Sequence, residues 1–275
     1  MKKILLAFDG DHFPESSLQF VRQLKEEDSV FLIGAFLPQM QLASLWSLSG
    51  GGLSGGAFVP LVEEEDANEL VRNIKRFEAF CYSSRIDFQV HKDYFDLAIP
   101  SLTKESGFAD LMIISSEVFY KEAGSARRNR YLEDILHLTK CPVIIVPEVF
   151  EFPRRNILAY DGSESSIYAI EQFAYLFPYL TKNKTLLVHV PSKNKDRLPE
   201  EANIRQLVSQ QFSDAQFLLL ENRSKEAFTD WCWDMDKAIL VCGGYGRSGL
   251  SLLFRKSFIA GIISDHRLPV FVAHR

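Results

Sequence analysis

Short apolar runs alternate with longer amphipathic segments along the chain. Five runs in its second part contain almost no polar residue and lie at 156–160, 185–190, 215–221, 238–242 and 269–273. Such runs are typical of strands that are buried on both faces of a parallel sheet. Between them, apolar residues recur at helical spacing over 165–177, 200–212, 225–235 and 253–265. This alternation predicts an α/β fold in which helices cover both faces of a parallel sheet.

The first part of the chain repeats this pattern, with strands expected near 3–8, 29–37, 86–92, 110–115 and 142–147. Its opening KKILLAFDGD is echoed by RNILAYDGSE, so that Asp9 matches Asp161, 152 residues later. Two later segments, ADLMIISS and CPVIIVPE, are echoed by KAILVCGG at 237–244 and LPVFVAHR at 268–275. Repetition on this scale indicates two related units. We therefore expect two doubly wound, Rossmann-like domains in tandem, with bounds 1–150 and 151–275.

The last predicted strand of each repeat is apolar throughout, as PVIIVP in the first and PVFVA in the second. An apolar strand is unsuited to an exposed sheet edge, because its unpaired backbone groups and side chains would promote aggregation. We therefore predict that these two strands lie together at the centre of the molecule. The two domains would then form an internal pseudo-dimer around a pseudo-two-fold axis.

Composition and charge narrow the function classes. The 275 residues are 47% hydrophobic and 24% charged, with a net charge of −5, which is ordinary for a soluble globular protein. No apolar run approaches the about 18 residues of a membrane span. No basic stripe with interleaved aromatic residues suggests nucleic acid, and the scattered histidines show no metal-binding spacing. We expect a cytoplasmic protein with neither a nucleic acid nor a membrane as its partner.

The four cysteines show neither paired nor regular spacing; they are Cys81, Cys141, Cys232 and Cys242. Without such spacing, free buried thiols in a reducing compartment are favoured over disulfides or a zinc site.

A glycine-rich stretch, GGYGRSG at 243–249, follows the apolar run 238–242. Its glycines fit the dinucleotide fingerprint G-x-G-x-x-G, but they follow the fourth predicted strand of their repeat and not the first. The next predicted strand, 269–273, is followed by His274 and Arg275 and supplies no carboxylate for a ribose. The stretch also falls short of a P-loop, because Leu250 stands where that motif has its lysine. Neither motif is favoured.

A third spacing suits its surroundings better. Gly243 and Gly246 form G-x-x-G at the carboxyl end of a predicted strand, where ligands bind in open α/β sheets. Glycine there permits close approach of a phosphate to the backbone. Ser257 lies near the start of the predicted helix 253–265, where free N–H groups favour an anion. Asp161 ends the first strand of the same repeat, so these residues are expected at one edge of the sheet.

The segments ILAYDGSESS at 157–166 and GGYGRSGLSLLFRKSF at 243–258, with the closing LPVFVAHR, resemble the universal stress protein family. The resemblance covers nearly the whole chain and is that of a tandem, two-domain member. It implies a stress-response protein that binds an adenine nucleotide, ATP or another, in the second domain and acts as a sensor or regulator. Whether Mg²⁺ accompanies the phosphates is left open. The nucleotide contacts that it implies are Asp161, Val190, Gly243, Gly246, Lys256, Ser257 and Phe258.

Two departures from the family pattern qualify this site. Lys256 stands where nucleotide-binding members have glycine, so its side chain either obstructs the phosphates or meets them with its ammonium. In the first domain, Ser115-Ser116-Glu117-Val118 replaces the glycines, and Glu117 adds negative charge, so that site is expected to be degenerate. The alternative function is a protein-interaction scaffold without nucleotide. We expect no catalytic residues, or a weak ATPase at most; protein partners and a further homodimer are left open.

Overall fold

The computed structural model describes residues 1–8, 13–36, 64–92, 98–116, 136–189, 197–220, 228, 231–232, 235–244 and 268–274. Within these ranges, the strands of the first half are β1 (Lys2–Phe8), β2 (Val30–Phe36), β3 (Asp87–Lys92), β4 (Leu111–Ser115) and β5 (Val143–Val146). Those of the second half are β6 (Arg155–Ala159), β7 (Lys184–His189), β8 (Asp214–Leu219), β9 (Ala238–Gly243) and β10 (Val270–Ala273). The strands lie within two residues of the predicted positions, because nearly all are apolar runs.

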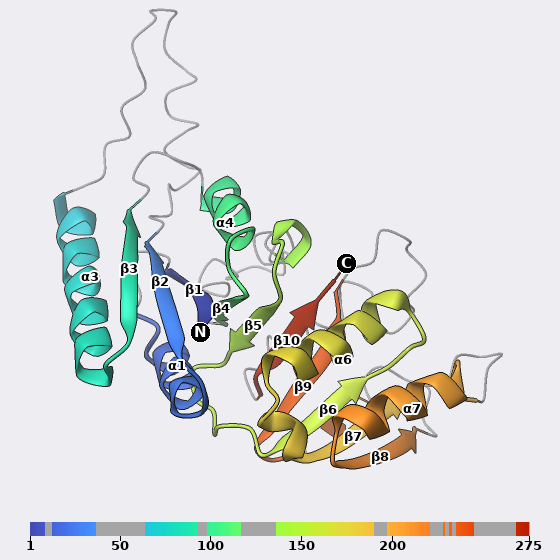
Figure 1. Cartoon of the computed structure of the whole chain (residues 1–275). Coiled ribbons are helices and arrows are strands. Elements are labelled where there is room, and N and C mark those ends of the chain that lie inside the picture. Colours follow the sequence, from blue (N-terminus) through green and yellow to red (C-terminus); the bar gives the residue numbers. More distant parts are fainter. Residues whose placement is uncertain are drawn as a thin grey trace, which may run out of the picture.

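All these strands form one sheet, in the order β3-β2-β1-β4-β5-β10-β9-β6-β7-β8. Each half therefore has the same order of strands, and the second half runs in the reverse direction outward from the central β5–β10 pair (Figure 1). Neighbours within a half are parallel, whereas β5 and β10 are antiparallel, with Ile144 opposite Phe271. The predicted pairing of the last strands is confirmed, and the α/β fold contains an internal pseudo-dimer.

Helices cover both faces of this sheet. One face carries α1 (Glu15–Glu27), α3 (Glu64–Ser84), α6 (Glu164–Leu176) and α7 (Glu201–Gln211), whose apolar residues form one core with the strands. Figure 1 shows α6 and α7 in front of the second half's strands. The other face carries α4 (Ala98–Ser106), whose Leu102 belongs to a second core. A short 3-10 helix, η2 (Leu180–Lys182), precedes β7. The predicted helix 253–265 and much of 225–235 lie outside the described residues.

Aromatic side chains pack around the junction of the two halves. Phe271 of β10 packs edge to face against Phe173 and Phe177 of the α6 region, with ring centroids 5.4 and 6.0 Å apart. Phe150 and Phe152 of the connecting segment lie 5.6 and 5.3 Å from the ring of Phe20 in α1. The connection between the halves is therefore packed onto the core and is not a free linker.

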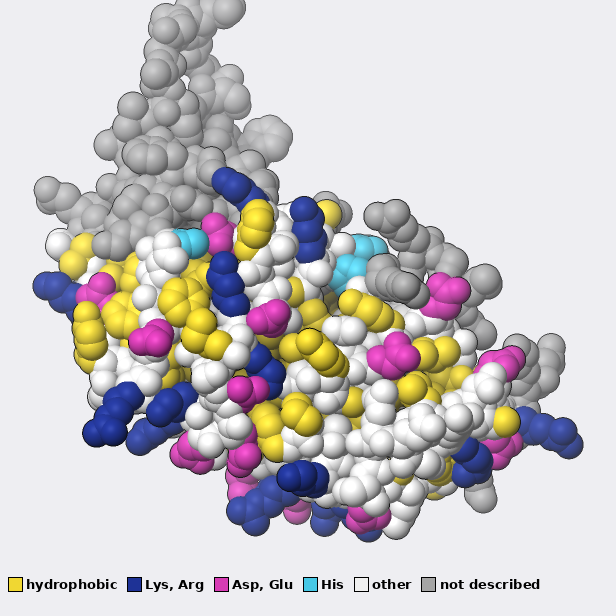
Figure 2. Space-filling view, viewed as in Figure 1, with side chains coloured by type: hydrophobic (Ala, Val, Ile, Leu, Met, Phe, Trp, Pro, Cys, Tyr) yellow, Lys and Arg dark blue, Asp and Glu magenta, His cyan; other side chains and the backbone are white. Residues whose placement is uncertain are grey.

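The remaining sequence predictions concern the surface and the thiols. All four cysteines are buried and free, as expected. Burial raises the pKa of Cys81 and of Cys141 to about 12, which keeps these thiols protonated and unreactive. Among the described helices, none has both the length and the apolar character needed to cross a bilayer. Figure 2 shows acidic and basic side chains interspersed with apolar ones over the visible face.

Candidate functional site

The strand order places a topological switch point in the second half, between β6 and β9. The chain goes from β6 to β7 on one side, whereas β9 pairs with β6 on the other, with Leu158 opposite Val241. In open α/β sheets, ligands bind at the carboxyl ends of the strands beside such a point. Asp161 lies just beyond the carboxyl end of β6, and Gly243 is the last residue of β9. The structure therefore brings these two predicted residues to the same edge; together with Gly162 they define the switch-point site.

The turn that begins α6 holds the Asp161 side chain. Its carboxylate accepts a hydrogen bond of 2.9 Å from the backbone N–H of Ser163. Ser163 is the N-cap of α6, and its hydroxyl accepts from the N–H of Ser166 at 3.1 Å. Gly162, between Asp161 and Ser163, has φ +82°, a conformation that glycine adopts without strain. Asp161 is therefore fixed at the carboxyl edge by local backbone geometry before any ligand is considered.

Gly243 has a packing role that the sequence did not reveal. A Cβ atom at this position would lie 2.6 Å from the carbonyl carbon of Ser165 and from the backbone nitrogen of Ser166. Only a residue without a side chain allows the first turn of α6 to approach the end of β9 so closely. This contact brings the N-terminus of α6, which carries partial positive charge, to the switch-point site.

Two buried side chains that sequence analysis did not select lie beside this edge. The Tyr160 hydroxyl donates to the backbone carbonyl of Pro199 at 2.9 Å, and Pro199 also packs on Gly162. His189, the last residue of β7, has its Nδ1 atom 2.8 Å from the carbonyl oxygen of Tyr160. Because a carbonyl only accepts, Nδ1 carries the proton. The His189 Nε2 atom is buried and has no hydrogen-bond partner in the described part of the chain.

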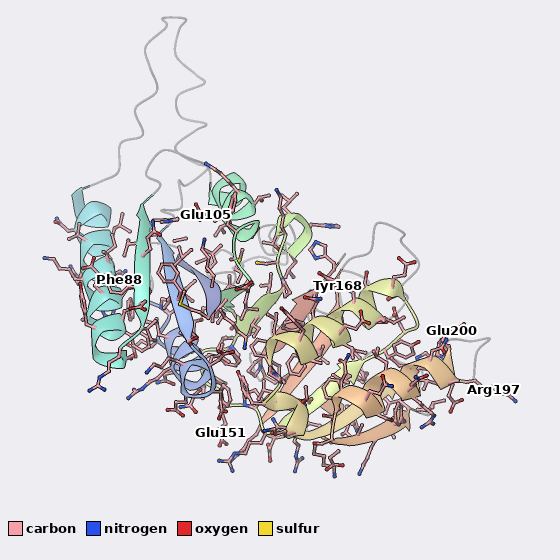
Figure 3. All side chains as sticks on the ribbon, viewed as in Figure 1. Phe88, Glu105, Glu151, Tyr168, Arg197 and Glu200 are labelled. Atoms are coloured by element: carbon pink, nitrogen blue, oxygen red, sulfur yellow. The ribbon has the colours of Figure 1, made fainter. Side chains whose placement is uncertain are left out.

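Tyr160 and His189 tie three elements together. Tyr160 follows β6, His189 ends β7, and Pro199 immediately precedes Glu200, the N-cap of α7. Figure 3 shows Glu200 at this end of α7. In the sequence, both residues stand inside or just after apolar runs, so they look like strand residues. The polar group of each side chain within an apolar run was the only signal that it needs a hydrogen-bond partner. The sequence does not reveal that partner, because it is distant along the chain.

Replacing Tyr160 by phenylalanine is expected to flatten the alkaline loss of stability. Burial, reinforced by the negative charges of Glu200 and Asp161, raises the Tyr160 pKa from 10.0 to about 12. The folded state therefore holds this proton more tightly than the unfolded state, and stability declines as pH rises from 10 to 12. The wild type should lose about 2 kcal/mol more than Tyr160→Phe across that window, by urea unfolding at each pH. Parallel declines in the two proteins would contradict this role.

Five of the seven predicted contacts are not placed by the structure. Asp161 and Gly243 lie together at the switch-point site, as described above. The others lie outside the described residues: Val190, which directly follows β7, and Gly246, Lys256, Ser257 and Phe258. In the described residues, no group of three His, Cys, Asp or Glu side chains is arranged to hold a metal ion.

The first half has the same switch point with different residues. Strand register places Ser115 opposite Val146, as it places Gly243 opposite Ala273. Ser115 therefore occupies the glycine position, and its side chain is buried. Helix α1 begins at Glu15, six residues after Asp9, whereas α6 begins at Glu164, three residues after Asp161. The first half thus has a longer connection before its helix and a serine at the end of β4. The second half has no room for a side chain at the matching position, Gly243. Asp9 and Glu117 lie outside the described residues.

Comparison with known proteins identifies the fold. No protein-family model and no curated protein sequence matches the chain. A universal stress protein from Archaeoglobus fulgidus DSM 4304 matches 100% of this chain and 96% of its own, with a TM-score of 0.68 and 15% identity. A functionally unknown protein from Pseudomonas aeruginosa PAO1 matches 100% and 92%, with a TM-score of 0.52 and 14% identity. The expected tandem fold, similar to that of universal stress proteins, is confirmed.

Proposed function

We propose that this protein is a cytoplasmic stress-response regulator that binds one adenine nucleotide, ATP, at the switch-point site of its second domain. The domains are 1–150 and 151–275. The observation that carries the proposal is the meeting of Asp161 and Gly243 at the carboxyl ends of the two strands that flank the switch point. These are the positions that the family resemblance assigns to the adenosine end and to the phosphates.

The chemistry of the site suits the two ends of a nucleotide. The Asp161 carboxylate is held at the edge by the Ser163 N–H, and a carboxylate is an acceptor that suits hydroxyl donors of the ligand. Gly243 brings the partly positive N-terminus of α6 to the same edge, where an anion is favoured. Gly246 and Ser257 supply backbone and hydroxyl contacts to the phosphates in this proposal. Residues 153–275 carry a net charge of +3, from 16 basic and 13 acidic residues, which favours an anionic ligand there.

The fold offers a route from occupancy to the rest of the molecule. Helix α6, which starts at the switch-point site, packs on both β9 and β10. Strand β10 in turn pairs with β5 of the first half. A shift of the first turn of α6 on nucleotide binding therefore acts on the strand that joins the halves. This supports a sensor or regulator, with the first domain serving as its structural partner.

Release of bound material tests the proposal on the full-length protein. The protein is purified without added nucleotide and denatured, and the released small molecules are separated by chromatography and identified by mass spectrometry. We expect an adenine nucleotide, at up to one molecule per chain. If nothing is released and the protein also fails to bind added ATP, the scaffold function without nucleotide replaces this proposal.

Replacing Lys256 by glycine is expected to strengthen ATP binding about tenfold, which corresponds to about 1.4 kcal/mol. In this account the lysine side chain obstructs close approach of phosphate to the backbone. Calorimetry at low and high salt measures the effect. Lys182→Gln, which removes a surface charge in η2 at the opposite edge of the sheet, serves as a control and should not change the affinity. Weaker binding by Lys256→Gly, most marked at low salt, would show instead that the ammonium is a phosphate ligand.

A further inference from the structure

A cavity of about 320 Å³ lies against the second half, away from the switch-point site. It begins at Arg155 and Lys184, the first residues of β6 and β7, and thus at the opposite edge of the sheet from Asp161. Its volume falls within the range of small-molecule sites, about 300–1,000 Å³. The side chains that decide its chemistry are Arg155, Lys184, Leu186, Gln216, Leu218 and Trp231.

Strand register places the cavity on one face of the sheet. Lys184 is opposite Arg155, and Leu186 is opposite Gln216. Phe217, the neighbour of Gln216, faces α7, because the Arg205 guanidinium of that helix stacks 4.3 Å from its ring centroid. Side chains alternate along a strand, so Gln216 and its neighbour two residues on point to the other face. The cavity therefore lies on the face opposite α7.

The two cations at its mouth have no ion-pair partner in the described part of the chain. Asp214 is opposite Lys184 in register, yet no salt bridge joins them there. Two other cations near strand starts are paired: Lys2 with Asp28 at 2.6 Å, and Lys237 with Glu151 at 2.7 Å. Among the described residues that line the cavity there is no carboxylate. The mouth therefore presents two cations that are free of direct ion pairs among the described residues and can meet an incoming anion.

The rest of the lining is mainly apolar and includes an aromatic ring. Trp231 is half-buried and stacks on Phe228, with ring centroids 5.9 Å apart and planes at 24°. Leu186 and Leu218 provide aliphatic surface beside it. Gln216 adds an amide that both donates and accepts hydrogen bonds. A ligand that suits both parts carries its anionic group at one end and an apolar ring system at the other.

The corresponding corner of the first half is filled. Register matches Lys184 with Phe31, whose side chain packs into the core of that face. It also matches Leu218 with His91, whose Nδ1 atom lies 3.0 Å from the Glu105 carboxylate of α4, labelled in Figure 3. The first half thus has the Phe31 ring in place of Lys184, and the His91–Glu105 pair in place of Leu218. The difference is local, because the strands around it are the same.

We propose that this cavity binds a small organic anion with a flat apolar body, an aromatic carboxylate or sulfonate. The anionic group lies between Arg155 and Lys184, and the ring system lies against Trp231, Leu186 and Leu218. This site is separate from the nucleotide site and does not depend on it. The second half would then bind a second ligand at the edge of the sheet where β6 and β7 begin.

Two matched dyes test the proposal on the full-length protein: 8-anilinonaphthalene-1-sulfonate and the uncharged N-phenyl-1-naphthylamine, which has the same ring system. Dye fluorescence measures the affinity of each. We expect the sulfonate to bind at one saturable site, at least tenfold more tightly than the neutral dye. Arg155→Gln with Lys184→Gln should weaken sulfonate binding about tenfold or more and leave the neutral dye unchanged. Trp231→Leu should weaken both dyes.

The controls separate this site from others. Lys182→Gln removes one exposed charge next to β7 and should leave both affinities unchanged. All variants should remain folded at the assay temperature, as their melting curves show, which excludes dye binding to unfolded chain. Equal affinity for the two dyes, or sulfonate binding that the double variant leaves intact, would overturn the proposal. Displacement of the sulfonate by ATP in the wild type but not in Asp161→Ala would also overturn it, because the dye would then occupy the switch-point site.

Discussion

Replacing Phe271 by alanine should lower the free energy of unfolding by about 3–5 kcal/mol, the usual cost of emptying a buried phenylalanine site. Phe271 is fully buried at the centre of β10, and its ring contacts Phe173 and Phe177 edge to face. Its backbone pairs with Ile144 of β5, so the cavity would open where the two halves meet. Rigid strands on both sides limit collapse of the surrounding side chains.

Urea unfolding followed by circular dichroism measures this change. Tyr175→Ala on α6 is the matched control: it also removes a ring, but its side chain is 79% exposed, so the loss should stay within about 0.5 kcal/mol. A loss below about 1 kcal/mol for Phe271→Ala would mean that the junction is not a packed core. Separate unfolding of the two halves in the variant would be consistent with the junction carrying their coupling.

Gly243→Val should abolish ATP binding and also reduce stability by about 1–3 kcal/mol, a typical cost of overpacking. The first side-chain atom would already lie 2.6 Å from the backbone of Ser165 and Ser166. The first turn of α6 would have to move away from β9, and the Asp161 carboxylate that this turn holds would move with it. Valine also excludes a phosphate from the backbone at this position.

Ser115→Ala is the control for this prediction. It changes the matching position of the first half, where a side chain is already accommodated. ATP binding should stay at the wild-type level, whatever this change costs in stability. Calorimetric titration of each folded variant with ATP measures both outcomes. Wild-type affinity in Gly243→Val would exclude the end of β9 from the nucleotide site.

The strands were predictable because nearly all of them are apolar runs. The central pairing of β5 with β10 was predictable for a related reason, since two strands without polar residues cannot both be sheet edges. The serine at the end of β4 was also visible in the sequence, because Ser115 replaces the glycine in an otherwise repeated pattern. These features follow from patterns along the chain and from the exclusion of water from apolar surface.

Other features depend on contacts between distant segments. Sequence analysis assigned Gly243 to phosphate approach and did not anticipate its contact with the first turn of α6. The hydrogen bond from Tyr160 to the Pro199 carbonyl joins residues 39 apart in sequence. Arg155 and Lys184 look like ordinary solvated residues until the register of β6 and β7 places them opposite each other. Hydrophobic periodicity carries no signal for such relations.

The central claim is that the nucleotide site belongs to the second domain alone. Calorimetric titration of ATP into the ligand-free wild type, Asp161→Ala and Asp9→Ala tests it directly. We expect one ATP per wild-type chain, unchanged affinity in Asp9→Ala, and about tenfold weaker binding in Asp161→Ala from the loss of a charged hydrogen-bond acceptor. Equal losses in the two variants, or no binding by the ligand-free wild type, would contradict the claim.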